Sequence, residues 1–461
     1  MSLVFGFAPT TSPSAARVRQ ARFGVLATFA FLGMMLSTFL SRVPTIRDLL
    51  GVSASGLANL IIFGAVGALA GLLVTGWAAA KFGTRALLLW SSFGALLGTV
   101  GQAAGAVEGS KLVFAAGYFL VSFSFAFANV AMNTEAAEVQ RRMGKPVMSQ
   151  FHAGFSIGMA VALAVGAFVS HLGVSVLWHF TAVAALLTIV RVSIVGVSAL
   201  NGAADPDKPP AGFGGPFATA KAEYKNKRVL LIGVIVFGAS MAEMTAAQWM
   251  SLAVVDDFGK PEAIGDLMYW AFVISMVTVR WLGAPIIGRL GRVVSLRTAA
   301  VSIAFGVLIF ALTPVFWLIP IAALFWGMGS ALGVPIAFTA AADEPKRAAA
   351  AVAAVASFST VSGLMVPQVI GNLAEWFPLR HAMLVVLLAA MTTFILARAV
   401  RSDGPLFRSR RATARQVGSA VLQSDEVAAG GSVSGFWESD SDPARRTPRP
   451  VDGTHNPSSR K

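Results

Sequence analysis

Glu243 and Arg280 are the residues of this chain best placed to do chemistry, because each lies inside a long apolar stretch. A charge in the hydrocarbon of a bilayer costs about 2.5 to 3.5 kcal/mol on insertion scales, so a charged residue at that depth indicates a functional role. A carboxyl at Glu243 can bind a solute hydroxyl or amine, or carry a coupling proton. The structural alternatives are a protonated contact between helices and a carboxylate that faces a wet vestibule.

A pairing of these two charges follows from their depth. Glu243 lies about nine residues and Arg280 about fourteen residues from one membrane surface, which is ~8 Å apart at about 1.5 Å per residue. Two long side chains can close that gap. Such a pair lowers the cost of both charges and can exchange with a solute, while a static ion pair between adjacent helices explains the same residues.

A polar series follows at the end of another apolar stretch. Asn129, Asn133 and Glu135 have the spacing i, i+4 and i+6. Residues four apart share one face of a helix, so we expect the two asparagines to line a common cavity and Glu135 to point away from them. Glu135 takes part in substrate or proton binding, or it neutralises Arg141 or Arg142 at the membrane surface.

Three further residues complete the candidate site. His152 can titrate near neutral pH, and at a helix end it can equally be a structural hydrogen-bonding residue. Gln248 and Trp249 follow Glu243 by about one and a half helical turns. An amide beside an aromatic face suits a polyol, so we predict that both form walls of a cavity.

The composition predicts that transmembrane helices position these residues. Of the 461 residues, 56% are hydrophobic and 13% are charged, against roughly 25% charged in soluble domains. A helix needs about 20 apolar residues to cross a bilayer. Stretches of that kind lie at residues 21–42, 56–80, 86–107, 112–134, 147–170, 173–195, 229–252, 266–288, 294–313, 315–340, 348–373 and 380–400. We therefore predict an all-α membrane protein with twelve transmembrane helices.

The polar segments divide the chain. Residues 201–228 combine Pro, Gly and charge, which is typical of a mobile linker, and they separate six helices from six. The predicted order is a cytoplasmic amino terminus (1–20), a six-helix bundle (21–200), the cytoplasmic linker (201–228), a second six-helix bundle (229–400) and a cytoplasmic tail (401–461). The tail is rich in Ser, Arg, Asp and Pro, so we predict that it is disordered.

Lys and Arg predict the orientation. With the amino terminus inside, the inner segments before the tail hold eighteen Lys and Arg and the outer segments hold five. This bias places both termini and the linker in the cytoplasm of a multi-pass protein of the bacterial plasma membrane. The net charge of +14 is therefore mainly a topology signal. It predicts contact with anionic lipid headgroups rather than with nucleic acid.

Several functions are disfavoured by what the sequence lacks. The chain has no Cys, and we find no spacing typical of a metal cluster, a nucleophile with its base, or a phosphate-binding loop. We therefore predict no enzyme activity, no cofactor and no metal, and an energy source other than ATP. The expected partners are a small solute, protons and the lipid bilayer, with the protein itself a monomer.

The two halves also repeat one another. Segments 76–85 and 283–292 each place a small-residue helix end beside a Gly turn with cations, and Phe155-Ser156 has a counterpart in Phe358-Ser359. Two six-helix repeats with a substrate site between them near the midplane are typical of a rocking transporter.

These repeated segments resemble the major facilitator superfamily. Its loop motif, Gly-x-Leu-Ala-Asp-Arg-x-Gly-Arg-Arg, is matched in part twice; the matching residues, which the resemblance implies take part in gating, are Gly76, Lys81, Gly83 and Arg85, and more weakly Arg289, Gly291 and Arg292. The Asp of the motif, which helps to latch the halves on the cytoplasmic side in the family, is replaced by Ala80 and Gly288.

A narrower resemblance bears on the substrate. Segments 41–53 and 130–139, Ala242-Glu243 and Gln248-Trp249 resemble a bacterial branch related to fucose permease and to the membrane protein of rhizopine gene clusters. This implies a secondary active transporter for a sugar, cyclitol or related polar solute, coupled to protons. The alternatives are an efflux carrier for drugs or metabolites and a non-transporting sensor or scaffold. The Gly-Pro signature of drug/proton antiporters is absent from span 147–170, which disfavours multidrug efflux.

Overall fold

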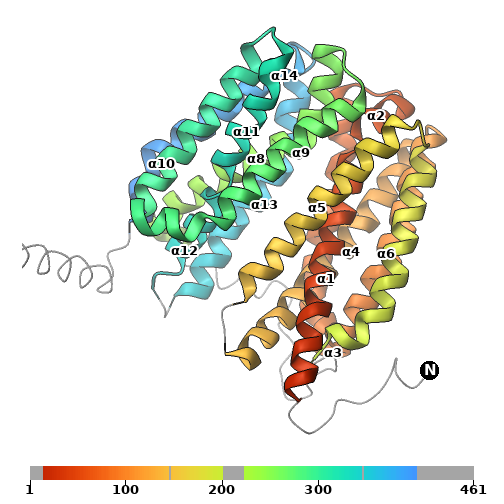
Figure 1. Ribbon diagram of the computed structural model, residues 1–461, viewed down its shortest axis with the longest axis vertical. Coiled ribbons are helices and arrows are strands. Elements are labelled where there is room, and N and C mark those ends of the chain that lie inside the picture. The colour runs from red at the N-terminus through yellow and green to blue at the C-terminus, as the bar shows by residue number, and fades with distance from the viewer. Residues whose placement is uncertain (1–13, 145–146, 201–222, 345–346, 402–461) are drawn as a thin grey trace, which may run out of the picture. The chain divides into compact units, whose positions relative to one another are not determined.

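The fold is built from helices, as predicted (Figure 1). A computed structural model describes residues 14–144, 147–200, 223–344 and 347–401, so most of the predicted amino terminus, linker and tail lies outside the described residues. We refer to residues 14–200 as the N-half and to residues 223–401 as the C-half. The N-half contains α1 (Ala15–Leu40), α2 (Val43–Leu50), α3 (Ala54–Val107), α4 (Lys111–Met143), α5 (Met148–His171) and α6 (Val176–Ser198).

The C-half crosses the membrane as many times as the N-half, but its spans are divided into more helices. Its helices are α8 (Lys227–Phe258), α9 (Glu262–Trp281), α10 (Gly283–Leu312), α11 (Ile319–Ser330), α12 (Gly333–Ala341), α13 (Ala348–Leu373), α14 (Leu379–Ala382) and α15 (Val386–Leu396). Short 3-10 turns are η1 (Glu223–Lys225), η2 (Phe316–Leu318), η3 (Met383–Val385) and η4 (Ala397–Val400).

Two glycines reverse the chain inside apparently continuous helices. Gly83 in α3 has φ 78° and ψ 166°, and Gly291 in α10 has φ 76° and ψ 163°. This backbone region is essentially restricted to glycine. Eleven helical stretches of the described chain are long and apolar enough to span a membrane, and one of these is the 54-residue α3. Because α3 turns back at Gly83, it supplies two crossings, and the predicted twelve spans are confirmed.

Some boundaries differ from the prediction. The short α2 was not expected, and α4 continues to Met143 instead of ending near 134. Predicted span 315–340 is interrupted at Ala331 and Leu332, between α11 and α12. Hydropathy does not reveal such a break, because the two residues at the break are themselves apolar.

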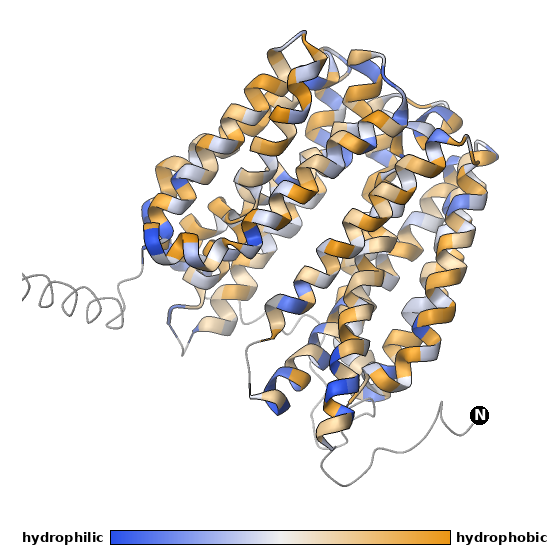
Figure 2. Cartoon of the chain, viewed as in Figure 1, coloured by the Kyte–Doolittle hydropathy of each residue, from blue (hydrophilic) through white to orange (hydrophobic). Residues whose placement is uncertain are grey.

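Glycines allow the closest helix contacts. A Cβ at Gly158 of α5 would lie 1.9 Å from the carbonyl oxygen of Ala30 in α1, and one at Gly33 would lie 2.1 Å from that of Phe155. Small residues are the means by which membrane helices approach each other. The outward faces instead carry large exposed apolar side chains such as Leu112 and Trp317, and apolar colour follows the helices along their length (Figure 2). These faces require lipid as their solvent.

Candidate functional site

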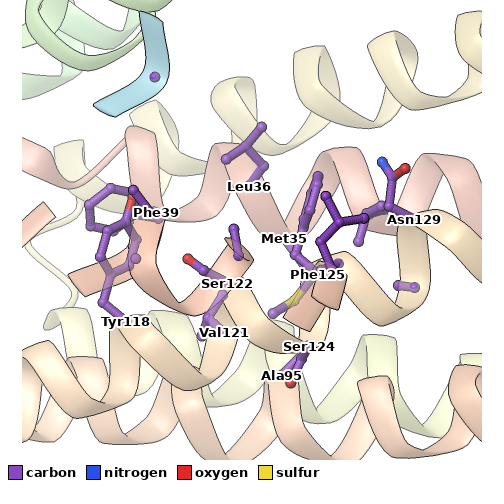
Figure 3. Close-up of a pocket in the computed structure, with 18 of the residues that line it drawn as sticks. Met35, Leu36, Phe39, Ala95, Tyr118, Val121, Ser122, Ser124, Phe125 and Asn129 are labelled. Atoms are coloured by element: carbon purple, nitrogen blue, oxygen red, sulfur yellow. The ribbon is translucent and has the colours of Figure 1, made fainter. Parts of the chain in front are cut away.

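A cavity of about 750 Å³ lies between the helices of the two halves. Its lining comes from α1, α3, α4 and α6 of the N-half and from α8, α12 and α13 of the C-half. Tyr118, Ser122 and Asn129 of α4 lie along one wall beside Met35 and Phe39 of α1 (Figure 3). The volume is in the range of small-molecule sites in proteins.

The lining contains polar groups in an apolar setting. Ser91, Thr99 and Gln102 reach it from α3, and Gln248 reaches it from α8. The Gln102 Nε2 and Gln248 Oε1 atoms are buried without a hydrogen-bond partner among the described residues. Buried amides are normally bonded, so both atoms are available to a solute.

Glu243 and Arg280 form the ion pair that their depths predict. The Arg280 Nη2 atom donates to Glu243 Oε2 at 2.9 Å, and both side chains are 29% exposed. Arg280 Nε also donates to the Ala331 carbonyl oxygen at 3.2 Å. That carbonyl lies at the break between α11 and α12, so Arg280 connects α8 and α9 to the interrupted helix. Neither charge is part of the cavity lining, although Met244 is.

The two asparagines share one helical face, as predicted, but only Asn129 lines the cavity. Asn133 donates from Nδ2 to Asn129 Oδ1 at 3.2 Å, and Asn129 lines the cavity. His152 is exposed near the beginning of α5, with its ring 5.2 Å from that of Phe29. Neither His152 nor Asn133 belongs to the lining.

Two expectations require correction. Trp249 is fully buried in a hydrophobic core that includes residues of both halves, and it is not part of the cavity lining. Adjacent helical residues point about 100° apart, which sends Gln248 to the cavity and Trp249 into the core. The carboxylate that pairs with Arg141 and Arg142 is Glu138, not Glu135.

Glu135 instead lies in a buried cluster at the end of the bundle that holds the two loop motifs. It is 1% exposed and accepts hydrogen bonds from the Thr84 hydroxyl and, at 2.7 Å, from the Leu200 amide. Thr84 follows Gly83 directly, so Glu135 fastens the turn of the first loop motif to α4. We call this end of the bundle, which contains Gly83 and Gly291, the loop-motif end.

The C-half repeats that arrangement. Arg292, which follows Gly291, donates from Nη1 to both oxygens of Asp343 at 2.8 and 2.9 Å, and Arg228 donates to the same carboxylate at 2.8 Å. Among the other motif residues, Gly76 and Arg85 belong to α3, Arg289 is exposed, and the Lys81 ammonium lies over the rings of Trp77 and Phe82 at 5.1 and 5.3 Å. A carboxylate thus anchors the turn of each motif.

Contacts that join the two halves gather at the opposite end, which we call the α2 end. Glu262 of α9 accepts from Thr45 N and Oγ1 at 2.8 and 2.7 Å and from Ser170 Oγ at 2.6 Å. It also pairs with Arg42 at 3.1 Å, and Arg47 pairs with Asp256. In the described ranges, the hydrogen bonds and ion pairs between the halves all lie toward this end.

Sequence reasoning missed two charged residues. Arg191 of α6 is 5% exposed and lines the cavity, and Glu262 joins the halves. Arg191 had a usable signal, since it is the one Lys, Arg, Asp or Glu in the apolar predicted span 173–195 and such a charge is costly in a membrane. Glu262 lies just before a predicted span, where a carboxylate is unremarkable, so its signal was weak.

Comparisons with known proteins agree with this architecture. The sequence profile of the Major Facilitator Superfamily matches residues 145–367. An uncharacterized transporter of Sinorhizobium fredii is 28% identical over 389 residues, covering 81% of this chain and 96% of the relative. An uncharacterized MFS-type transporter of Yersinia pestis is 26% identical over 373 residues, covering 81% and 94%.

Solved structures give the same fold. The nucleoside transporter NupG superimposes with a TM-score of 0.63 at 17% identity, covering 83% of this chain and 98% of that one. The xylose transporter XylE from E. coli, in a partially occluded inward-open conformation, gives 0.60 at 13% identity, covering 82% and 97%. The relatives are transporters rather than enzymes, and the chain is a multi-pass integral membrane protein that belongs to the major facilitator superfamily.

Proposed function

We propose that the protein is a secondary active transporter that moves a small polar solute, a sugar, cyclitol or related compound, by alternating access. The observation that carries this proposal is a cavity lined by both halves. Among the residues described, the hydrogen bonds and ion pairs between the two halves lie only at the α2 end. Rocking of the halves about such a site exposes it to one side at a time. In the predicted orientation, the closed α2 end faces outward and the solute is reached from the cytoplasm.

The proposed coupling group is Glu243. Protonation of its carboxyl removes the charge that holds Arg280 at 2.9 Å. Arg280 is then free to change its contact with the Ala331 carbonyl at the α11–α12 break. A proton bound at Glu243 would therefore loosen a contact among three spans of the C-half, which is the kind of two-state element that coupling requires.

The first experiment identifies the solute and then tests the coupling. Thermal stabilisation of the purified protein by sugars, cyclitols, amino sugars and hydrophobic drugs selects a ligand, because a ligand that binds only the folded state raises its stability. Proteoliposomes then report proton-driven accumulation and exchange of that ligand. Glu243→Gln preserves shape but cannot titrate, so we expect it to lose accumulation and retain exchange.

The control is Glu108→Gln, which makes the same change at an exposed carboxylate at the end of α3 and should behave as wild type. If Glu243 binds solute without carrying a proton, its Gln variant will lose affinity with an unchanged pH profile. Wild-type accumulation, exchange and affinity in Glu243→Gln would contradict both roles. Stabilisation by drugs alone would favour efflux, and absence of any transport would favour a sensor.

A further inference from the structure

Arg191 is a buried cation without a carboxylate partner among the residues that the structure describes. It lies on α6, 5% exposed, and donates from Nη2 to Ser91 Oγ of α3 at 3.0 Å. No ion pair of the described chain includes it, whereas Arg280, Arg292 and Arg42 each have an acidic partner. A buried charge that is not paired by the protein is costly, and an anionic solute bound beside Arg191 would lower that cost.

The cavity supplies the place for that anion. Of the residues that line it, Arg191 alone is charged, and the lining contains no Asp or Glu. The occupant of such a site therefore faces a net positive charge. A cationic amine would be repelled there, while a carboxylate can accept two parallel hydrogen bonds from a guanidinium fork.

The surrounding polar groups suit a hydroxylated molecule. Ser91 and Thr99 are eight residues apart on α3 and Gln102 follows three residues later, so they form one stripe along a helical face. Ser124 and Asn129 of α4 also line the cavity (Figure 3). Hydroxyls and amides arranged along a stripe can bind successive hydroxyls of a polyol, with the charged fork at one end.

We infer that the Ser91–Arg191 pair is an anion-binding subsite of the cavity and that the solute is a hydroxylated carboxylate, such as a hexuronate, rather than a neutral sugar or an amine. This rests on the proposed function, since it specifies the substrate class of the same cavity. The carboxylate binds the free face of the Arg191 guanidinium, and the hydroxyls bind the polar stripe.

Matched probes test the inference directly. D-glucuronate and D-glucose share a ring and differ in a carboxylate against a hydroxymethyl group, so their ratio of affinities isolates the charge. We expect the purified wild-type protein to bind glucuronate at least about tenfold more tightly, which corresponds to about 1.4 kcal/mol. Arg191→Gln should abolish the preference. Arg191→Lys should keep a reduced preference, because it keeps the charge but loses the fork.

A second variant separates binding from folding. Ser91→Asp places a carboxylate beside Arg191, satisfying the buried cation inside the protein while occupying the anion subsite. We expect this variant to be as stable as wild type or more stable, and to lose the preference for glucuronate. Arg19→Gln, an exposed Arg at the start of α1, is the matched control and should retain the preference.

The outcomes distinguish this inference from the proposed function. Wild-type protein that binds no glucuronate or prefers glucose would overturn the anion subsite, as would an unchanged preference in folded Arg191→Gln and Ser91→Asp. Exchange of a neutral sugar in those cases would leave the transporter intact. Binding of glucuronate that depends on Arg191, without movement of any solute in liposomes, would support the subsite and overturn transport.

Discussion

At the scale of single residues, Glu262 concentrates the contacts that join the two halves. One carboxylate accepts from Thr45 and Ser170 and pairs with Arg42, and all three partners belong to the N-half. The Arg42 and Glu262 side chains are only 5% and 10% exposed. Burial makes such a pair expensive to break on one side, because the remaining charge loses its partner.

Glu262→Gln should therefore favour separation of the halves at the α2 end. Loss of one member of a buried pair costs about 3 to 5 kcal/mol, and each 1.4 kcal/mol changes a population ratio about tenfold. Distance measurements between spin labels on α2 and α9 should show a larger open population than in wild type.

Glu108→Gln, at an exposed site of the same end, should leave that distance distribution unchanged. A distribution in Glu262→Gln that matches wild type would mean that Glu262 does not hold the halves together. Thr45→Ala removes one hydrogen bond and keeps the ion pair, so its effect should be smaller.

At the scale of helices, the sequence predicts which segments leave water but not which way each one is turned. The twelve spans and the Gly83 and Gly291 turns follow from apolar length and from glycine between cations. The rotation of each helix about its axis does not follow from the sequence. Lipid is as apolar as a protein core, so a membrane helix has no polar outer face that would reveal its orientation. The sequence therefore predicts both Gln248 and Trp249 as cavity walls, although only Gln248 lines the cavity.

The same limit explains the missed break and the missed cation. The interruption between α11 and α12 occurs within apolar residues, so only tertiary contacts such as that of Arg280 with Ala331 reveal it. Arg191 was visible as a charge in an apolar span, but only the packed helices show that no described carboxylate pairs with it. The Glu243–Arg280 pair could be predicted because both residues are polar and adjacent spans fix their depths.

Close packing of α1 against α5 gives a prediction for helices. The Cβ atom added by Gly158→Val would lie 1.9 Å from the Ala30 carbonyl oxygen, so the two helices must move apart. We expect lower yield of monodisperse protein and a lower Tm, since overpacking costs about 1 to 3 kcal/mol or more. Gly288→Ala, with no atom within 4 Å of the added Cβ, should match wild type. Equal stability of the two variants would contradict the packing of α1 on α5.

At the scale of the whole molecule, the orientation in the membrane remains a prediction of the Lys and Arg distribution. The chain has no Cys, so one introduced Cys is the only site for a maleimide. Lys111 begins α4 at the α2 end and Lys225 lies in η1 before α8, and both are exposed. With the loop-motif end in the cytoplasm, an impermeant maleimide should label Lys111→Cys in intact cells.

Lys225→Cys should be labelled only after the membrane is permeabilised. The reverse pattern would invert the protein, and labelling of both in intact cells would break the predicted arrangement of spans. Cysteine-free wild type gives the background.

The ion pairs that close the α2 end also make it responsive to dissolved salt. Arg47 and Asp256 are 16% and 28% exposed, whereas Arg42 and Glu262 are more deeply buried. The Debye length is about 8 Å at 0.15 M ionic strength and about 3 Å at 1 M. Mobile ions therefore weaken the Arg47–Asp256 pair and scarcely reach the Arg42–Glu262 pair. The Arg47–Asp256 pair therefore makes closure of the α2 end depend on ionic strength. The Arg42–Glu262 pair keeps that end closed at high salt.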